Sequence, residues 1–378
     1  EPETVTQQPE AMALHLTQAG LAAEAASWWL EAGRRSLARS ALTEATRLLR
    51  RGLDALEREA ATPENLALRI ELSALLGPAY IGLHGPGSKE AQELYTRASG
   101  ICQNLPDAPG HFPIYWGWWR VAPDFATHIQ RSRVFLERAR AHGDPEFMLE
   151  AHHCNWASHY HAGDFAACCD HIEAGLTIYQ QGDYRHHARL YGNHDPKVCA
   201  LGERAQLLWM QGRLTAALAD EADSIAWAER LDHLGSRVHA MDFALLHRVY
   251  RRDYSIVFDE AGRLATFTSE YGLDDHRARA LIFRGWIMAM REDAERGLAT
   301  LQEGLKRQRD INTTEDYPVY ICLLAEALAA AQAAALHLPL RRVPGGQRMF
   351  AISAILIGVI GIFYVRRRSA RKKSAPAR

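Results

Sequence analysis

The chain has 378 residues, of which 48% are hydrophobic and 24% charged. Ten Lys or Arg and no acidic residue lie within 341–378, so residues 1–340 carry a net charge of −11 within a total of −1. The abundance of Ala, Leu, Arg and Glu favours helices over a β domain. An acidic body without a basic stripe argues against nucleic-acid binding.

A repeat runs along the chain. Its units begin at small or turn-forming residues, and the intervals are 48, 35, 40, 49, 40 and 40 residues. The starts are Ser40, Ser88, Pro123, Gly163, Gly212, Arg252 and Glu292. This spacing predicts one elongated all-α domain, a right-handed superhelix (α-solenoid) of helix hairpins in which each start is a tight turn.

Most units carry apolar residues two, six and thirteen residues after the start, for example Leu42, Phe125 and Leu214 at the first offset. Glu90 and Thr46 depart from the pattern. At about 100° per residue these offsets lie within about 40° of one another, which predicts one narrow buried face. The segments predicted to cover that face are 147–160, 198–210, 238–250 and 278–290.

The cysteines are scattered, with no CxxC pair and no secretory signal; they are Cys102, Cys154, Cys168, Cys169, Cys199 and Cys322. This pattern favours reduced, mostly buried thiols in a cytoplasmic repeat domain. The sequence begins at Glu1 rather than Met, which favours a fragment of a longer protein.

The C-terminal part has a different character. Residues 349–365 form an uncharged apolar run of 17 residues between basic clusters. This length is at the lower limit for a transmembrane helix, and flanking arginines are typical of a bilayer boundary. A buried terminal helix and a segment lying along an anionic membrane remain open as alternatives.

The predicted organisation is therefore a disordered N-terminal segment at 1–9, a helical repeat domain at 10–338, a basic linker at 339–348, a transmembrane helix at 349–365 and a basic tail at 366–378.

Several stretches resemble one family, namely 15–57, 111–120 (HFPIYWGWWR), 149–165 (LEAHHCNWASHYHAGDF) and 191–201 (YGNHDPKVCAL). They resemble the tetratricopeptide-type (TPR-like) region of bacterial adenylate/guanylate cyclase and AAA/STAND-type ATPase signalling proteins. The resemblance covers about residues 10–335 and implies a repeat that binds a partner and controls an attached ATPase or cyclase. No cyclase or ATPase domain is present in this sequence, and the apolar tail is not part of the family pattern.

The glycine-rich segment 82–89 (GLHGPGSK) has the order Gly-Ser-Lys rather than the Gly-Lys-Ser/Thr of a phosphate-binding loop, so we interpret it as a turn. Histidines crowd residues 152–194. His187, His194 and Asp195 are candidate metal ligands in the longest connection, 182–196. The competing interpretation is that His194 and Asp195 cap or order this connection before a helix that begins near Pro196.

An aromatic cluster offers candidate partner-binding residues: Tyr115, Trp118, Trp119 and Trp156, with Trp116 beside them. Aromatic residues at helical spacing favour a core position over a ligand groove. No pattern of nucleophile and base indicates catalysis, and no cofactor is predicted.

The predicted function is a non-catalytic scaffold for protein–protein interaction in a bacterial signalling protein, anchored to a membrane by its C-terminal segment, with a protein or peptide partner on a concave face. One alternative is the C-terminal sensor fragment of an ATP-binding cyclase or ATPase regulator. Others are a membrane-tethered adaptor that acts alone and a zinc enzyme that depends on His187 and His194.

Overall fold

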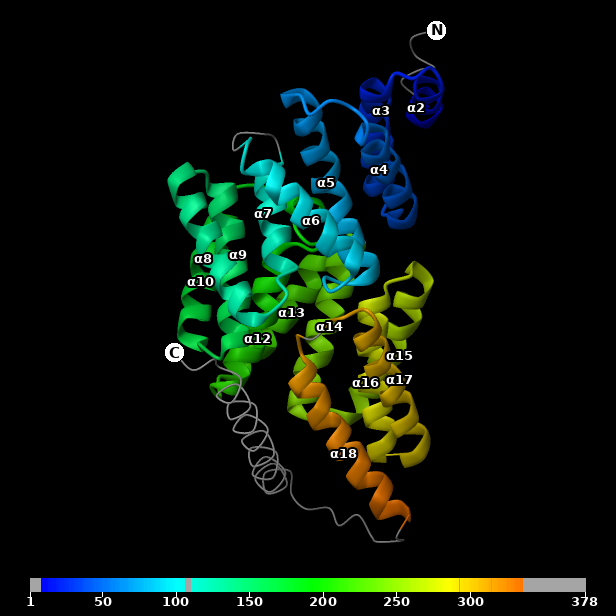
Figure 1. Cartoon of the computed structure of the whole chain (residues 1–378). Coiled ribbons are helices and arrows are strands. Elements are labelled where there is room, and N and C mark those ends of the chain that lie inside the picture. Colours follow the sequence, from blue (N-terminus) through cyan, green and yellow to red (C-terminus); the bar gives the residue numbers. More distant parts are fainter. Residues whose placement is uncertain (1–7, 106–109, 292, 314, 336–378) are drawn as a thin grey trace, which may run out of the picture.

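The computed structural model describes residues 8–105, 110–291, 293–313 and 315–335. These residues form 17 helices and no strand, which confirms the all-α prediction (Figure 1). The helices are α2 (Pro9–Gln18), α3 (Ala22–Ala38), α4 (Leu42–Leu56), α5 (Pro63–His84), α6 (Lys89–Cys102), α7 (His111–Arg120), α8 (Phe125–His142), α9 (Pro145–Ala162), α10 (Phe165–Tyr179), α11 (His187–Leu190), α12 (Pro196–Met210), α13 (Leu214–Leu231), α14 (Leu234–Arg251), α15 (Tyr254–Tyr271), α16 (Asp274–Arg291), α17 (Ala294–Asp310) and α18 (Tyr317–Ala335).

Consecutive helices pack against one another as hairpins. The most extensive packing joins α16 to α17, α3 to α4, α9 to α10 and α12 to α13. The four segments predicted to be partner helices lie inside α9, α12, α14 and α16. In Figure 1 the α8–α10 group and the α15–α17 group lie on opposite sides of the molecule, with α12–α14 between them.

The predicted starts at Ser40, Gly163, Gly212 and Arg252 are tight turns with a left-handed backbone. Their φ angles are +56°, +74°, +78° and +61°. A left-handed residue ends a helix because it turns the next amides back toward the last free carbonyls. Ser88 begins its unit differently, as the N-cap whose hydroxyl accepts from the Ala91 amide. These turns confirm five of the seven predicted unit boundaries.

The other two predicted starts differ. Pro123 does not have a left-handed backbone, and the next residue, Asp124, is the N-cap of α8. Glu292 lies outside the described residues.

The buried face of the second helices differs from the predicted stripe. Phe125 and Leu214 are 43% and 55% exposed, whereas Leu42 is buried as predicted. The enclosed positions recur five, nine, twelve and sixteen residues after the start: Cys168, Ile172, Gly175 and Tyr179 in α10; Ala217, Glu221, Ser224 and Ala228 in α13; and Val257, Ala261, Leu264 and Thr268 in α15. Many of these side chains are small because paired helices approach closely. Small residues give a weak hydrophobic signal, so the prediction followed the larger residues at the edge of the contact.

Aspartates fix the beginnings of several helices. The side chains of Asp124, Asp144, Asp164 and Asp293 accept backbone N–H groups at the first turns of α8, α9, α10 and α17. An N-cap satisfies an amide that has no partner within the helix, and its negative charge suits the positive end of the helix dipole.

One described helix, α5, is long and apolar enough to cross a membrane, and 61% of its apolar window is buried inside the protein. It packs on α4, α6 and α7, so it is accounted for as a core helix. The predicted linker 339–348, transmembrane helix 349–365 and basic tail 366–378 lie outside the described residues, as do residues 1–7 of the predicted N-terminal segment.

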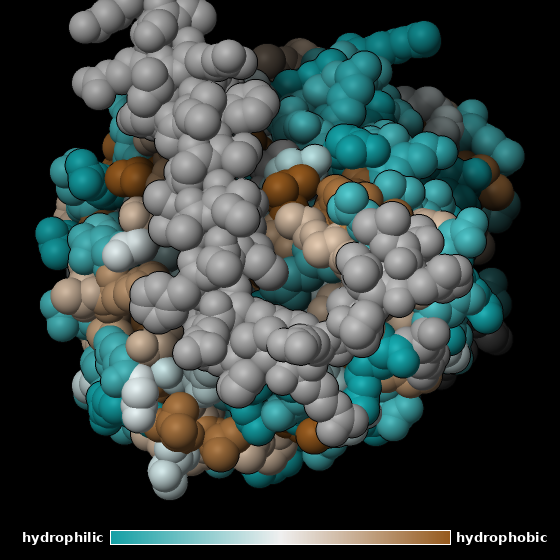
Figure 2. Space-filling model, turned by 90° about the horizontal axis from the view of Figure 1, so that it is seen from below, coloured by the Kyte–Doolittle hydropathy of each residue, from teal (hydrophilic) through white to brown (hydrophobic). Residues whose placement is uncertain are grey.

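Large apolar side chains at the surface are spread over several helices. On the face shown in Figure 2 they form separate groups among hydrophilic residues. The exposed ones are Leu14, Leu21, Phe125, Met210, Leu214, Leu218, Ile256, Tyr271 and Leu328. Scattered surface residues of this kind are ordinary in folded proteins.

Candidate binding cavity at the centre of the coil

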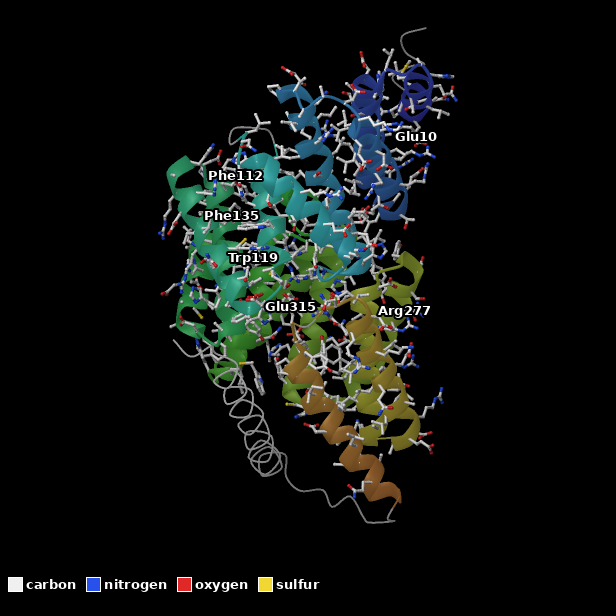
Figure 3. The ribbon with its side chains drawn as sticks, viewed as in Figure 1. Glu10, Phe112, Trp119, Phe135, Arg277 and Glu315 are labelled. Carbon is white, nitrogen blue, oxygen red and sulfur yellow. The ribbon has the colours of Figure 1, made fainter. Side chains whose placement is uncertain are left out.

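A cavity of about 90 Å³ lies where repeats far apart in sequence meet. Its wall is built by α7, α9, α12, α14 and α16, by the end of α5, and by the connections that precede α12 and α18. Charged and imidazole side chains line it alongside aromatic ones. Figure 3 shows Trp119 and Glu315 inside the coil, whereas Glu10 lies at its N-terminal end.

Glycines allow the connections to touch. A Cβ atom on Gly87 would lie 2.0 Å from the carbonyl oxygen of Asn312, and one on Gly235 would lie 1.8 Å from that of Asn193. The turn after α5 therefore rests directly on the connection between α17 and α18. Gly85 in this turn has a φ of +81°, and the turn predicted within 82–89 is confined to residues 85–88, between α5 and α6.

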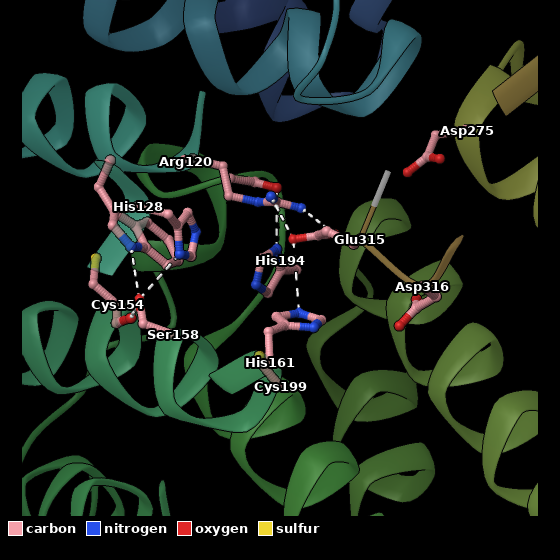
Figure 4. Close-up of polar contacts among 12 residues, drawn as sticks. Arg120, His128, Cys154, Ser158, His161, His194, Cys199, Asp275, Glu315 and Asp316 are labelled. Atoms are coloured by element: carbon pink, nitrogen blue, oxygen red, sulfur yellow. Dashed lines mark hydrogen bonds and ion pairs between the residues drawn. The ribbon is translucent and has the colours of Figure 1, made fainter. Parts of the chain in front are cut away.

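Arg120 and Glu315 join two distant segments across the cavity (Figure 4). Arg120 Nη1 lies 2.6 Å from Glu315 Oε1, and Nη2 lies 2.8 Å from Oε2, although the residues are 195 positions apart. Such a two-point pair fixes both position and orientation. Burial alone would raise the pKa of Glu315, but Arg120, His161 and Arg279 hold it well below its usual range.

Arg279 lies among several carboxylates. Its guanidinium is 2.8 Å from Asp316, 3.3 Å from Asp242, and 3.4 Å from both Asp275 and Glu315. Side chains that are buried and charged are costly unless they are paired and hydrogen-bonded. This network therefore pairs its charges, but it holds more acidic groups than basic ones.

Two acidic oxygens in the wall remain unpaired among the described residues, Glu203 Oε2 and Asp242 Oδ1. Burial, together with the nearby charges of Glu315 and Asp316, raises the pKa of Glu203 to about 8. The Glu203 carboxyl is consequently protonated at neutral pH and can donate a hydrogen bond. The Glu203 carboxyl and Asp242 Oδ1 can therefore each form a further hydrogen bond with a group that enters the cavity.

Histidines form the opposite part of the wall. His194 Nε2 faces His153 Nε2 at 3.3 Å, and the rings of His194 and His239 stack with centroids 4.0 Å apart. Burial lowers the pKa of His194 to about 3, so its ring is neutral. Behind this group the Glu150 carboxylate accepts from His153 Nδ1 at 3.0 Å and from His187 Nδ1 at 2.7 Å.

The structure does not bring the metal candidates His187, His194 and Asp195 into one ligand set. Among the described residues, the sets with closely spaced ligand atoms are His153, His194 and Cys199, and separately Glu146, His186 and His187. Asp195 caps α12 by accepting from the amides of Lys197 and Val198, and it also accepts from Tyr179 Oη. The capping interpretation of Asp195 is confirmed, and α12 begins at Pro196 as expected.

The aromatic candidates are mostly core residues. Tyr115, Trp119 and Trp156 are buried, and Trp118 is half-buried beneath the guanidinium of Arg131, whose Cζ lies 4.0 Å from the ring centroid. Of these four, Trp119 lines the cavity, and its Nε1 donates to Ser158 Oγ at 3.1 Å.

Sequence reasoning missed Arg120, Arg279, Glu315 and Asp316 as site residues. Asp275 and Arg279 are four residues apart on a helix whose other buried side chains are mainly apolar. That pairing was a usable signal, since charges on the buried side of a helix need partners. Arg120 and Glu315 gave no comparable local signal.

No family model matches the chain. An uncharacterized protein of Rhizobium meliloti is 33% identical over 323 residues, which make up 85% of this chain and 31% of that protein. The chain thus spans about a third of the length of the curated relative it matches.

Two solved structures are similar. One is a Rap protein complexed with competence and sporulation factor, with a TM-score of 0.55, 12% identity, and coverage of 93% of this chain and 98% of that chain. The other is a STAND signal transduction ATPase with a tetratricopeptide repeat sensor from Pyrococcus horikoshii, with a TM-score of 0.39, 12% identity, and coverage of 81% and 46%. The first likeness extends over nearly the whole chain and, with the hairpins described above, confirms the predicted fold: the chain is a TPR-like α-solenoid.

Proposed function

We propose that this chain is a non-catalytic binding module that regulates a longer bacterial signalling protein by holding a segment of a protein partner at its central cavity. The observation that carries the proposal is the Arg120–Glu315 pair, which bridges α7 and the connection before α18 across the cavity. An occupant at this point contacts helices from both halves of the α-solenoid. Its binding energy can therefore favour one curvature of the coil over another.

The size and charge of the cavity indicate the kind of group it accepts. A volume of about 90 Å³ suits a side chain rather than a drug-sized ligand, whose pockets are typically about 300–1,000 Å³. Acidic groups outnumber Arg120 and Arg279, and Asp242 Oδ1 has no partner among the described residues. A Lys or Arg side chain of a partner peptide would supply the complementary charge.

The titrating groups support binding rather than catalysis. Burial raises the pKa of the Cys199 thiol, whereas a nucleophilic cysteine needs a lowered one. Burial also lowers the pKa of His194 to about 3, which is far from the range near neutrality that suits a general base.

A place within a larger protein is supported by the relative in Rhizobium meliloti, which extends well beyond the matched region. The alternative in which the module is the sensor of an ATP-binding cyclase or ATPase regulator agrees with such a larger protein, and its nucleotide chemistry rests on the family resemblance alone. The Rap structure holds competence and sporulation factor, and its likeness in fold supports a bound partner for this coil as well.

The binding proposal is tested with short capped peptides that carry a central Arg, Lys, Glu or Leu. Because Trp116 and Trp119 line the cavity, tryptophan fluorescence reports occupancy. We expect the Arg and Lys peptides to bind and Asp242→Asn to weaken them by about tenfold, equivalent to about 1.4 kcal/mol. Equal responses to all four peptides, or none, would contradict the proposal.

Membrane anchoring through residues 349–365 is a separate part of the proposal. Carbonate-washed vesicles should retain the full chain and release a variant truncated after Leu340. Release of both proteins by carbonate would contradict membrane anchoring, but it would not bear on the proposed binding of a partner at the cavity.

A further inference from the structure

We propose that His153, His194 and Cys199 form a zinc-binding site in the wall of the central cavity. The three residues come from α9, from the connection before α12 and from α12 itself, and all are buried. Their ligand atoms lie within 4.8 Å of one another. The inference goes beyond the proposed function, because a resident metal ion requires no partner peptide.

The hydrogen bonds of the two histidines leave two lone pairs facing each other. His194 Nδ1 lies 3.1 Å from the carbonyl oxygen of Gly192, which can only accept, so Nδ1 carries the proton. His153 Nδ1 lies 3.0 Å from Glu150 Oε2 and donates to that carboxylate. In neutral imidazoles both Nε2 atoms are then acceptors, yet they lie 3.3 Å apart. Such a contact needs either a shared proton or a metal ion between the rings.

The spacing fits a metal ion. Zinc binds histidine nitrogen at about 2.0–2.1 Å in a tetrahedral arrangement, which places two nitrogen ligands about 3.3 Å apart. Ligating histidines usually donate their other N–H to a carboxylate or a backbone carbonyl. Glu150 and Gly192 are acceptors of these two kinds.

Cys199 supplies the third ligand from the first turn of α12. Its Sγ also lies 3.8 Å from Glu203 Oε1, one helical turn further along. Two nitrogens and one thiolate suit zinc, which accepts both kinds of donor. All three residues line the cavity, so its interior can supply a fourth ligand. A water molecule or a group of an occupant can complete the tetrahedron there.

The test uses the full chain, purified from medium containing zinc and then dialysed. We expect about one zinc per chain by mass spectrometry. After replacement by cobalt, we expect an absorption band from cysteine thiolate to cobalt. Cys199→Ser should abolish this band, and His194→Gln should reduce zinc affinity at least tenfold. Glu150→Gln should weaken binding about 10–100-fold, as the loss of an outer-shell partner does.

Matched controls separate this site from other sources of metal. Cys168→Ser removes another buried cysteine, and His186→Gln disrupts the second cluster, so both should retain the zinc and the cobalt band. Circular dichroism checks that each variant is folded. If a ligand variant does not fold, the unmodified chain and Cys168→Ser still test the proposal, because both should show the band from cysteine thiolate to cobalt. A metal-free chain that binds neither ion, or zinc that is lost in His186→Gln instead, would overturn the proposal.

Discussion

The two faces of α16 are built on different principles. Toward α17 the contact is backbone against backbone: a Cβ atom on Gly285 would lie 2.3 Å from the Leu301 nitrogen, and one on Gly297 would lie 2.2 Å from the Ala289 nitrogen. Toward the cavity the same helix presents Arg279, which pairs with Asp275 on this helix and with carboxylates on other elements, the shortest contact being 2.8 Å to Asp316. The packing of α16 against α17 therefore depends on close backbone contact, whereas its packing at the cavity depends on ion pairs.

This difference separates the contacts of α16 that join consecutive helices from the contacts to which the proposed function assigns binding. The α17 face joins consecutive elements, so burial of small apolar side chains stabilises it without any ligand. Burying ion pairs stabilises a fold less than good apolar packing does. We therefore attribute the charged face at the central cavity to the proposed binding of an occupant rather than to folding.

The largest effect is expected for Arg279→Met. Removing this guanidinium leaves Asp242, Asp275 and Asp316 without their shared cation, and breaking a buried pair in this way costs about 3–5 kcal/mol. Urea unfolding at pH 7 measures the loss. Arg277→Met is the control, because Arg277 lies on the outer side of α16 in Figure 3 and should change stability by about 0.5 kcal/mol or less. Equal losses would mean that the cavity face is no more sensitive than the outer surface.

A smaller effect, with a defined pH dependence, is expected for Glu315→Gln. The pKa of Glu315 is lower in the folded protein than its usual 4.5, so the carboxylate stabilises the fold above about pH 4.5, and this contribution disappears as the pH falls below that value. The substitution should cost about 1.5–3 kcal/mol at pH 7, as the loss of a hydrogen bond to a charged group does. Urea midpoints between pH 7 and pH 3 should show a shallower acid decline in the variant. Parallel curves would assign the acid sensitivity to other carboxylates.

Gly285→Ala tests the shape-dependent face. The added methyl group meets backbone atoms of Leu301 and Gly297, which cannot move aside as a flexible side chain can. Overpacking of this kind costs about 1–3 kcal/mol. The change should be the same at pH 4 and pH 7, unlike that of Glu315→Gln, because no charge is involved. A neutral result would show that α16 and α17 can separate slightly.

The smallest effect, and one of opposite sign, is expected for Gly262→Ala in α15. A Cβ atom there meets nothing within 4 Å. Alanine restricts the unfolded chain and has the better helix propensity, so it should stabilise the protein by about 0.5–1 kcal/mol. Thermal unfolding of the two glycine variants side by side gives the comparison. Destabilisation by Gly262→Ala would indicate contacts of α15 beyond those in the structure.

Much of the fold could be predicted because its signals are local. Gly163 and Gly212 mark turns that only a left-handed residue permits easily, and the segments between them have helical length. The predicted stripe covers only one edge of the buried face of the second helices: Leu176 is buried as predicted, but Gly175 and Ser224, which are also enclosed, carry little hydrophobic signal.

The candidate site was less accessible to sequence reasoning. The sequence predicts His194 as a candidate ligand but groups it with His187 and Asp195, its neighbours along the chain. The imidazole nitrogen that faces its Nε2 belongs to His153, 41 residues earlier on another helix. Sequence proximity could not reveal this pairing, because it depends on how α9 packs beside the connection before α12.

The sequence by itself determined the hairpins, because helical periodicity, N-caps and left-handed turns act over a few residues. Only the tertiary structure decided which charges share the central cavity. Arg120 and Glu315 meet across 195 residues, and that meeting depends on the accumulated rotation of the repeats between them.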